Sequence, residues 1–243
     1  MSLRSLVNFV VPPRVKDRIK RDLGVPSIDR TLYAMRANGF HPQTVLDIGA
    51  YKGDWMKLCR SVWPASSVLM IEASPDRAAI LRELATSTTG LSAECALLGA
   101  TATEAARFYE QDSASSALPE GAKSGQPFVS LPMLTLDELT RGTIFESPEL
   151  IKLDVQGYEL EVLRGGKTAL KSAEAVLLEV NLIPVYEGAP LLQEVVEFMA
   201  AEGFRAYDIA GMIRRPLDGA LWQTDIVFVR YRSPLISSSS YGM

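Results

Sequence analysis

The residues best suited to chemistry in this chain are three acids near the ends of apolar runs. Asp47 lies in the run 43–49, Glu72 in the run 67–73 and Asp154 in the run 149–155. Runs rich in Val, Ile and Leu are typical of buried parallel strands. Ligands of open α/β sheets bind where the carboxyl ends of such strands meet. The sequence therefore predicts a ligand site built around carboxylates.

A glycine turn, Gly49-Ala50-Tyr51-Lys52-Gly53, connects the first run to a helix predicted over 53–63. Glycine lets the backbone turn sharply and approach a ligand closely. The turn lacks the third glycine of a dinucleotide fingerprint, and Asp54 at the helix start would repel a pyrophosphate. S-adenosylmethionine, which carries a ribose and a sulfonium but no phosphate, suits these residues better than NAD, the cofactor of the alternative oxidoreductase reading.

The cofactor is expected to contact the glycine turn, the neighbouring strand ends and the polar loop that begins near residue 112. Glu72 is suited to accept hydrogen bonds from ribose hydroxyls. Asp112 is a candidate partner for the adenine amino group. The predicted cofactor-binding residues are Asp47, Gly49, Ala50, Tyr51, Gly53, Glu72, Ala73, Asp112 and Asp154.

Composition and segment order indicate one catalytic domain. The 243 residues are 47% hydrophobic, and strand-like and helix-like segments alternate from 43 to 230. We assign 1–40 to a helical segment that covers the pocket or packs on the sheet edge, 41–231 to the domain and 232–243 to a disordered tail. A net charge of −4 argues against nucleic acid as a partner. Two unpaired cysteines and no apolar stretch long enough to span a membrane predict a cytoplasmic protein.

Element boundaries follow from periodicity and turn residues. One or two helices are expected over 14–40, and further helices over 53–63, 75–87, 158–171 and 190–203. The Gly165-Gly166 pair predicts close packing or a break in the helix 158–171. The polar stretch 112–126 is predicted to be a lid that orders when ligands bind. Strands are expected over 43–49, 67–73, 91–98, 104–112, 128–136, 149–155, 174–181, 205–209 and 224–230.

Several segments, taken in order, resemble the FkbM family of S-adenosylmethionine-dependent methyltransferases. They are LDIGAYKGD, IEASPDR, ALLGATATEAARFYEQDSASS, LTLDEL, IKLDVQGYELEVLRGG, LLEVN and TDIVFVR, within about 44–229. Tyr51 and Gln156 depart from the family pattern, which often has asparagine and an acid there. The resemblance implies an α/β, Rossmann-like class I methyltransferase with helices on both faces of a seven-stranded, mainly parallel sheet that has one reversed strand at its edge. It also implies methyl transfer, commonly to oxygen, on sugars or natural products.

The chemistry at the acceptor needs a base or a polarising group, and histidine is a poor candidate. His41, the one histidine, precedes the first strand and lies away from the ligand edge. Asp154 ends one strand and Glu179 and Asn181 end the next, so these oxygens are predicted to hold Mg²⁺ or to bind the acceptor directly. Lys152 is a further candidate base, with pairing to an acid as its alternative role.

The acceptor is expected to be a small molecule bound by polar groups around the same sheet edge. The predicted substrate-binding residues are Ser113, Ser115, Ser116, Asn181 and Tyr186. Asp154, Glu179 and Lys152 are the predicted catalytic residues. A noncatalytic S-adenosylmethionine-binding scaffold is the second alternative, and the sequence leaves the acceptor and the oligomeric state open.

Overall fold

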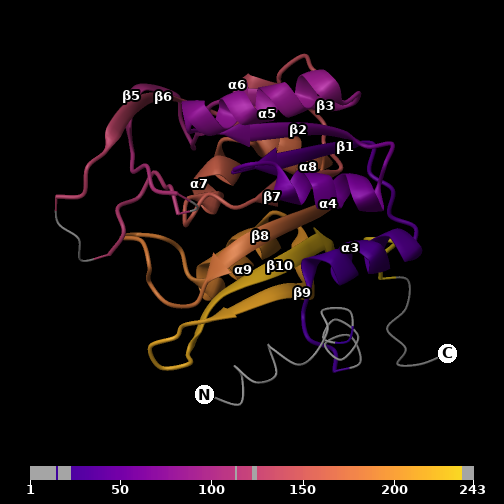
Figure 1. Cartoon of the computed structure of the whole chain (residues 1–243). Coiled ribbons are helices and arrows are strands. Elements are labelled where there is room, and N and C mark those ends of the chain that lie inside the picture. The colour runs from indigo at the N-terminus through magenta and orange to yellow at the C-terminus, as the bar shows by residue number, and fades with distance from the viewer. Residues whose placement is uncertain (1–14, 16–22, 113, 122–124, 237–243) are drawn as a thin grey trace.

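The computed structural model describes residues 15, 23–112, 114–121 and 125–236 (Figure 1). A seven-stranded sheet forms its centre, in the order β3-β2-β1-β7-β8-β10-β9. The first five strands in this order, β3, β2, β1, β7 and β8, pair in parallel with their neighbours. The strands are β1 (Thr44–Ile48), β2 (Ser67–Glu72), β3 (Leu91–Cys95), β7 (Leu150–Leu153), β8 (Ala175–Asn181), β9 (Phe204–Arg214) and β10 (Leu221–Arg230).

The reversed strand is β10, and it lies one position inside the edge. It pairs antiparallel with β8 and with β9, so the prediction of a reversed edge strand is wrong in this detail. The reason is visible in the side chains, since the run Ile226–Val229 is buried throughout, whereas β9 keeps exposed residues along its length. Such a run is typical of an interior strand, covered on both faces and paired along both edges, whereas an edge strand is partly exposed to solvent.

Helices cover both faces of the sheet, as the continuous buried runs of the central strands require. Figure 1 shows α3 (Ile28–Ala37) and α4 (Asp54–Val62) in front and α8 (Lys167–Ser172) behind. Leu81 of α5 (Pro75–Ser87) joins the core on the α4 side. On the opposite side lie residues of α6 (Leu136–Thr140), α7 (Glu159–Arg164) and α9 (Leu192–Ala201).

The predicted strand 91–98 divides between two sheets. Residues 91–95 form β3 of the main sheet, and Leu97 and Leu98 form β4, which pairs with β6 (Val129–Leu134) in a small sheet completed by β5 (Thr103–Phe108). Both β4 leucines are buried. Two consecutive buried residues need cover on both faces, which the small sheet provides at the end of the main one.

The predicted helix 158–171 breaks into α7 and α8 at Gly165-Gly166, and both glycines are closely packed. A Cβ atom on Gly165 would lie 2.1 Å from the carbonyl oxygen of Gly99, and one on Gly166 would lie 2.7 Å from Cδ2 of Leu136. The pair thus produces both effects predicted for it.

The segments on either side of the domain contribute to packing where they are described. Helix α3 packs against α4 and against β9 at the edge of the sheet, and it does not line the pocket described below. Leu235 is buried, so the packed chain continues beyond the predicted boundary at 231. No helix in the described ranges has the length and apolar character needed to cross a membrane.

Candidate active site

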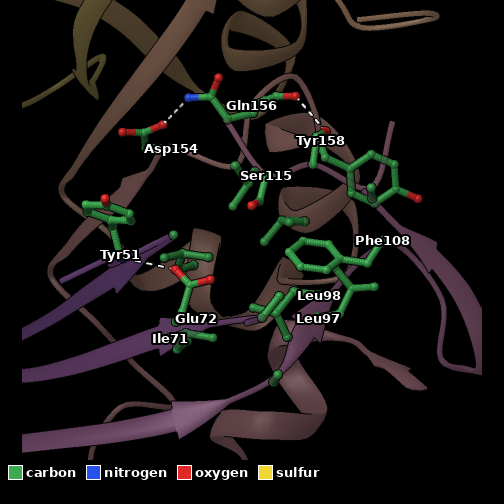
Figure 2. A pocket seen from close by; sticks show the side chains of 18 of the residues that line it. Tyr51, Ile71, Glu72, Leu97, Leu98, Phe108, Ser115, Asp154, Gln156 and Tyr158 are labelled. Carbon is green, nitrogen blue, oxygen red and sulfur yellow. Dashed lines mark hydrogen bonds between the residues drawn. The ribbon is translucent and has the colours of Figure 1, made fainter. Parts of the chain in front are cut away.

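A pocket opens at the carboxyl ends of β1, β2 and β7, where the acids were predicted to meet. Its volume is about 780 Å³ with the open mouth included. Figure 2 shows Glu72 and Tyr51 on one side of it, Leu97, Leu98 and Phe108 on another, and Asp154 and Gln156 across the cavity. The pocket therefore combines an acidic part with an apolar part, as ligand sites usually do.

The glycine turn forms one wall by lying directly against the end of β7. Gly49 has φ of 74°, and a Cβ atom there would lie 1.9 Å from the backbone oxygen of Asp154. The backbone N–H groups of Gly49 and Ala50 both donate to the carbonyl of Ile71, at 2.9 and 3.1 Å. Only glycine fits this close approach in the left-handed region, so the turn is fixed by backbone contacts.

Glu72 points into the pocket from the end of β2 and has accepting capacity left. Its Oε2 accepts a hydrogen bond from the backbone N–H of Tyr51 (3.0 Å), and its Oε1 accepts one from that of Ser74 (2.9 Å). Arg77 Nη1 lies 3.8 Å from Oε1. A carboxylate offers about four acceptor positions, so Glu72 can hold the turn and still accept from a vicinal diol.

The apolar part of the pocket is a slot at the junction of the two sheets. It is lined by Leu97 and Leu98 of β4, Phe108 of β5, and Tyr158 and Val162 around the start of α7. These residues were not predicted, because Leu97, Leu98 and Phe108 belong to the short strands of the small sheet and Tyr158 and Val162 have the apolar character of ordinary packing residues. An apolar slot beside an acid is suited to a purine ring beside its ribose.

Arg77 on α5 ties the loop after β5 to the pocket, and it was also missed. Its Nη1 donates to Ser115 Oγ (3.0 Å) and its Nη2 to the carbonyl of Gln111 (2.6 Å). The Tyr51 hydroxyl donates to Asp112 Oδ1 (2.6 Å), and this bond holds the pKa of Asp112 below its ordinary value. The described part of the predicted lid is therefore attached to the glycine turn and to α5.

Beneath the pocket floor, Lys152 and Asp47 form a buried ion pair. Lys152 Nζ lies 3.2 Å from Asp47 Oδ1, but neither Asp47 oxygen has a hydrogen-bond partner. Lys152 Nζ donates instead to the carbonyl of Gly49 (3.1 Å). Burial raises the pKa of Asp47 despite the nearby lysine. Burial alone would lower the pKa of Lys152, but Asp47 and Asp154 outweigh it, and the pKa is raised. Lys152 is thus a charged partner of acids, suited to support the turn.

The far wall is carboxylate-rich. Gln156 Nε2 donates to Asp154 Oδ1 (2.8 Å) and to Glu179 Oε1 (3.1 Å). Burial, and then the charge of Asp154, raises the pKa of Glu179 to about 9. Asp225 on β10 pairs with Glu179 in register, and burial raises its pKa to about 6. At neutral pH Glu179 is therefore neutral.

Comparison with known proteins agrees with this geometry. The Methyltransferase FkbM domain matches residues 47–206, more than half of the chain. The chain belongs to the FkbM methyltransferase family. This confirms the family predicted from the sequence motifs, and membership of a methyltransferase family supports S-adenosylmethionine as the cofactor. No curated protein matches the sequence at a significant level.

Solved structures place the FkbM chain in the class I methyltransferase fold. The FkbM methyltransferase of Methylobacillus flagellatus matches with 17% identity and a TM-score of 0.53, over 81% of this chain and 47% of that one. This chain therefore spans about half the length of that relative. A putative RNA methyltransferase from Pyrococcus horikoshii (13% identity, TM-score 0.46, 83% of this chain and 82% of that one) is also similar. A Burkholderia thailandensis 1,6-didemethyltoxoflavin-N1-methyltransferase with bound S-adenosylhomocysteine is similar as well (13% identity, TM-score 0.45, 88% of this chain and 83% of that one).

Most of the residues predicted to bind cofactor line the pocket of this FkbM protein, and three do not. Asp47 lies beneath it, Ala50 is buried, and Gly53 packs against Leu81 and Leu84 of α5. An acid inside β1 faces the α4 side of the sheet and not its edge, which explains Asp47. The predicted site residues that line the pocket are Gly49, Tyr51, Glu72, Ala73, Asp112, Ser115, Ser116 and Asp154.

The remaining predicted residues that the structure describes do not line the pocket. Lys152 is under the glycine turn, Glu179 adjoins Gln156, and Tyr186 donates its hydroxyl to Gln156 Oε1 (2.6 Å). Asn181 is buried and accepts from Gln223 Nε2 (3.2 Å), which also donates to Glu179 Oε1 (2.6 Å). Ser113 lies outside the described residues. The exclusion of nucleic acid and the cytoplasmic location stay predictions.

The proposed Mg²⁺ site gains no support from this arrangement. Among the described residues, no group of three or more His, Cys, Asp or Glu side chains is placed to hold a metal ion. The amide nitrogens of Gln156 and Gln223 are directed at the carboxylate of Glu179, and Asn181 Oδ1 is already used by Gln223. Amide donors occupy the positions that a cation would need, because both compete for the same oxygen lone pairs.

Proposed function

We propose that this protein transfers a methyl group from S-adenosylmethionine to a hydroxyl oxygen of a small-molecule acceptor, a sugar or a natural product, in the cytoplasm. The observation that carries the proposal is the placement of two acids, Glu72 and Asp154, on opposite sides of one pocket beside the Gly49 turn. Glu72 is suited to bind a ribose, and Asp154 is suited to bind an acceptor hydroxyl.

The residues of the pocket fit S-adenosylmethionine. Glu72 offers free lone pairs for the ribose hydroxyls, and the slot around Leu98 and Phe108 suits the adenine ring. The acids around Gly49 favour a cationic sulfonium, since Asp154 lies next to the turn. When bound, S-adenosylmethionine supplies an activated methyl group on that sulfonium.

Asp154 is the best-placed group to act on the acceptor. Its side chain is 38% exposed and lines the pocket, while Lys152 Nζ lies 3.7 Å from Oδ2. Oδ1 is occupied by Gln156, so Oδ2 is the oxygen that can accept the proton of an acceptor hydroxyl. Glu179 lies behind Gln156 and is neutral at pH 7, so it contributes a hydrogen-bonding group to this wall and not a second negative charge. The acceptor is then aligned by direct contacts.

The first test is binding and transfer with the intact chain. Calorimetry should show binding of S-adenosylmethionine and no comparable binding of NAD. Radiolabelled methyl transfer to a panel of glycosides, phenols and other hydroxylated small molecules should then identify an acceptor. Preference for NAD, or binding of S-adenosylmethionine without transfer to any acceptor class, would overturn the proposal.

The second test examines Asp154 once an acceptor is known. Asp154→Asn should lower kcat by about 10²-fold or more and leave cofactor affinity nearly unchanged, because the lost contact acts in the transition state. EDTA should leave wild-type activity intact. Loss of activity in EDTA with recovery in Mg²⁺ would show metal-assisted catalysis, and full activity in both Asp154→Asn and Glu179→Gln would exclude the carboxylate wall from the reaction.

A further inference from the structure

Gln156 occupies the centre of the carboxylate wall and uses both ends of its side chain. Its Nε2 donates to Asp154 Oδ1 (2.8 Å) and Glu179 Oε1 (3.1 Å), and its Oε1 accepts from the Tyr186 hydroxyl (2.6 Å). Figure 2 shows the side chain extended toward Asp154 at the rim of the pocket. One carboxamide therefore links residues from the end of β7, from β8 and from the loop after β8.

The orientation of this amide is determined by its neighbours. Tyr186 is buried, and burial raises the pKa of its hydroxyl, so the group stays protonated and donates. The opposite orientation would direct the Gln156 oxygen at two carboxyl groups and leave the Tyr186 hydroxyl facing an N–H₂ group. The N–H₂ end therefore faces the acids.

The backbone of Gln156 is held in a conformation that side-chain-bearing residues rarely adopt. Its φ is 57°, in the left-handed region, and the carbonyl accepts a hydrogen bond from Ser116 Oγ (2.8 Å). Such a conformation costs free energy and persists where the surroundings fix it, most often at functional sites. Gly157 follows with φ of 93°, and a Cβ atom there would lie 2.8 Å from Cβ of Ala189. The turn thus has little freedom to present another residue.

We propose that Gln156 is the positioning residue of the acceptor site: its N–H₂ group takes the place of a bridging cation between Asp154 and Glu179 and keeps Asp154 directed at the acceptor. This inference rests on the function proposed above. A bridging amide satisfies one oxygen of each acid and leaves Asp154 Oδ2, which lies 3.7 Å from Lys152 Nζ, free of the amide. It assigns this member of the family a side-chain donor where metal-assisted sites use an ion.

The charges around Gln156 explain why such a donor is needed. Two acids that share one donor repel each other unless one of them is neutral. Lys152 is the cation packed nearest to them, and Asp47 draws it toward the turn. The titratable groups that face the bridge are Lys152 and Asp154 from β7, Glu159 from α7, Glu179 from β8, Tyr186 from the following loop and Asp225 from β10.

Gln156→Glu tests the bridge without knowledge of the acceptor. The variant places a third acidic side chain where the N–H₂ group stood, and a hard cation bound between the three acids would neutralise them, so the site should recruit such a cation. Titration with MnCl₂, followed by calorimetry and by the paramagnetic resonance of Mn²⁺, should show affinity about tenfold or more above that of wild type. Gln193→Glu, an exposed change on α9 with the same charge, is the matched control and should bind Mn²⁺ no better than wild type.

A second measurement uses the wild-type fold. In ¹⁵N-labelled protein the Gln156 N–H₂ protons should exchange slowly, and Asp154→Asn should change their chemical shifts while Gln193 stays unaffected. A folded Gln156→Glu protein with wild-type Mn²⁺ affinity, or rapidly exchanging Gln156 N–H₂ protons, would overturn the bridge. Calorimetry with S-adenosylmethionine on the same samples separates the proposals, because loss of the bridge with intact cofactor binding refutes only the role of Gln156.

Discussion

At the end of the pocket that we propose to bind the cofactor, the cofactor end, backbone atoms fix the geometry. At the proposed acceptor end, side chains hold one another. The Gly49 turn is set by backbone bonds to Ile71 and by its approach to Asp154, and Glu72 accepts from two backbone N–H groups. The far wall depends on the carboxamide of Gln156. A site whose geometry is fixed by backbone contacts tolerates few substitutions, which suits a methyl donor that is common to many enzymes. A site held together by side chains can change one residue at a time, which suits a methyl acceptor that differs between enzymes.

Two non-glycine residues with positive φ mark these two ends. Tyr51 (φ 51°) lies within the glycine turn, and Gln156 (φ 57°) lies in the turn after β7. Both are positions where this chain departs from the family pattern, and both side chains form hydrogen bonds at the pocket, Tyr51 to Asp112 and Gln156 to Asp154 and Glu179. Their engagement in the site argues that the departures adapt the site and do not abolish it.

The largest expected effect is at the backbone-fixed end. Gly49→Ala should lower the free energy of unfolding by more than about 3 kcal/mol, because a Cβ atom would lie 1.9 Å from the Asp154 carbonyl oxygen in a left-handed conformation. Urea denaturation measures the change. Gly142→Ala is the matched control, since Gly142 has nearly the same φ (72°) with nothing within 4 Å of its Cβ position, and it should cost only about 1 kcal/mol. Equal losses in both variants would show that the turn is not tightly packed against β7.

The second effect is on cofactor affinity. Glu72→Ala should weaken S-adenosylmethionine binding by about 1–3 kcal/mol, because a charged acceptor for the ribose is lost. Calorimetry measures it, and Glu94→Ala on the exposed side of β3 is the control. Thermal unfolding of both variants separates lost ribose contacts from loosening of the Tyr51 and Ser74 amides that Glu72 holds. Unchanged affinity in a folded Glu72→Ala protein would remove Glu72 from the cofactor site.

The same contrast explains what the sequence could predict. Strand ends, the glycine turn and Glu72 follow from local patterns of apolar residues and glycine, which fix where the chain turns and which end of the sheet it reaches. The contact of Asp47 with Lys152 could not be predicted in this way, because it depends on the pairing of β1 with β7, which are about a hundred residues apart in sequence. Local patterns do not encode which distant strands become neighbours.

The acceptor end shows this limit most clearly. Asp225 meets Glu179 because β10 inserts between β8 and β9, an arrangement that apolar periodicity alone did not distinguish from an edge position. Arg77 was passed over because an arginine in the first turn of a helix usually faces solvent, and its role depends on the loop folded over it. The Gln156 bridge was missed because a side-chain amide gives no pattern that indicates which acids it will join.

The third expected effect is a pH dependence of stability that originates at the acceptor end. Glu179 has a pKa of about 9 in the folded protein against an ordinary 4.5. The unfolded chain therefore releases this proton first, and the free energy of unfolding falls as pH rises from about 4.5 to about 9, by at most about 1.4 kcal/mol per pH unit from this group. Glu159 and Asp225, with pKa values of about 7 and about 6, contribute below about pH 7.

The comparison with Glu179→Gln isolates Glu179, because Glu159 and Asp225 contribute equally to both proteins. Urea denaturation at pH 7.0, 7.75 and 8.5 should give a falling stability for wild type and a flatter dependence for Glu179→Gln. Glu94→Gln, on an exposed position, should keep the wild-type slope. A wild-type free energy of unfolding that rises over this interval, or the same slope in Glu179→Gln as in wild type, would show that Glu179 is ionised in the folded state. Asp154 and Glu179 would then both be negatively charged, and the Gln156 bridge alone would not account for their close approach.

The smallest expected effect tests whether the two ends are joined by the loop. Tyr51→Phe removes the hydroxyl that donates to Asp112 and keeps the ring, which lies 5.1 Å from the guanidinium of Arg77. Because Asp112 is exposed, we expect only about a twofold to fivefold faster release of S-adenosylhomocysteine in stopped-flow measurements. Amide hydrogen exchange should increase in 109–112 and stay unchanged around Gln156, because Ser116, which donates to the Gln156 carbonyl, is itself held by its backbone pairing with Tyr109. If exchange near Gln156 increases as well, the loop couples the two ends, and the acceptor wall depends on the cofactor turn more than its own hydrogen bonds indicate.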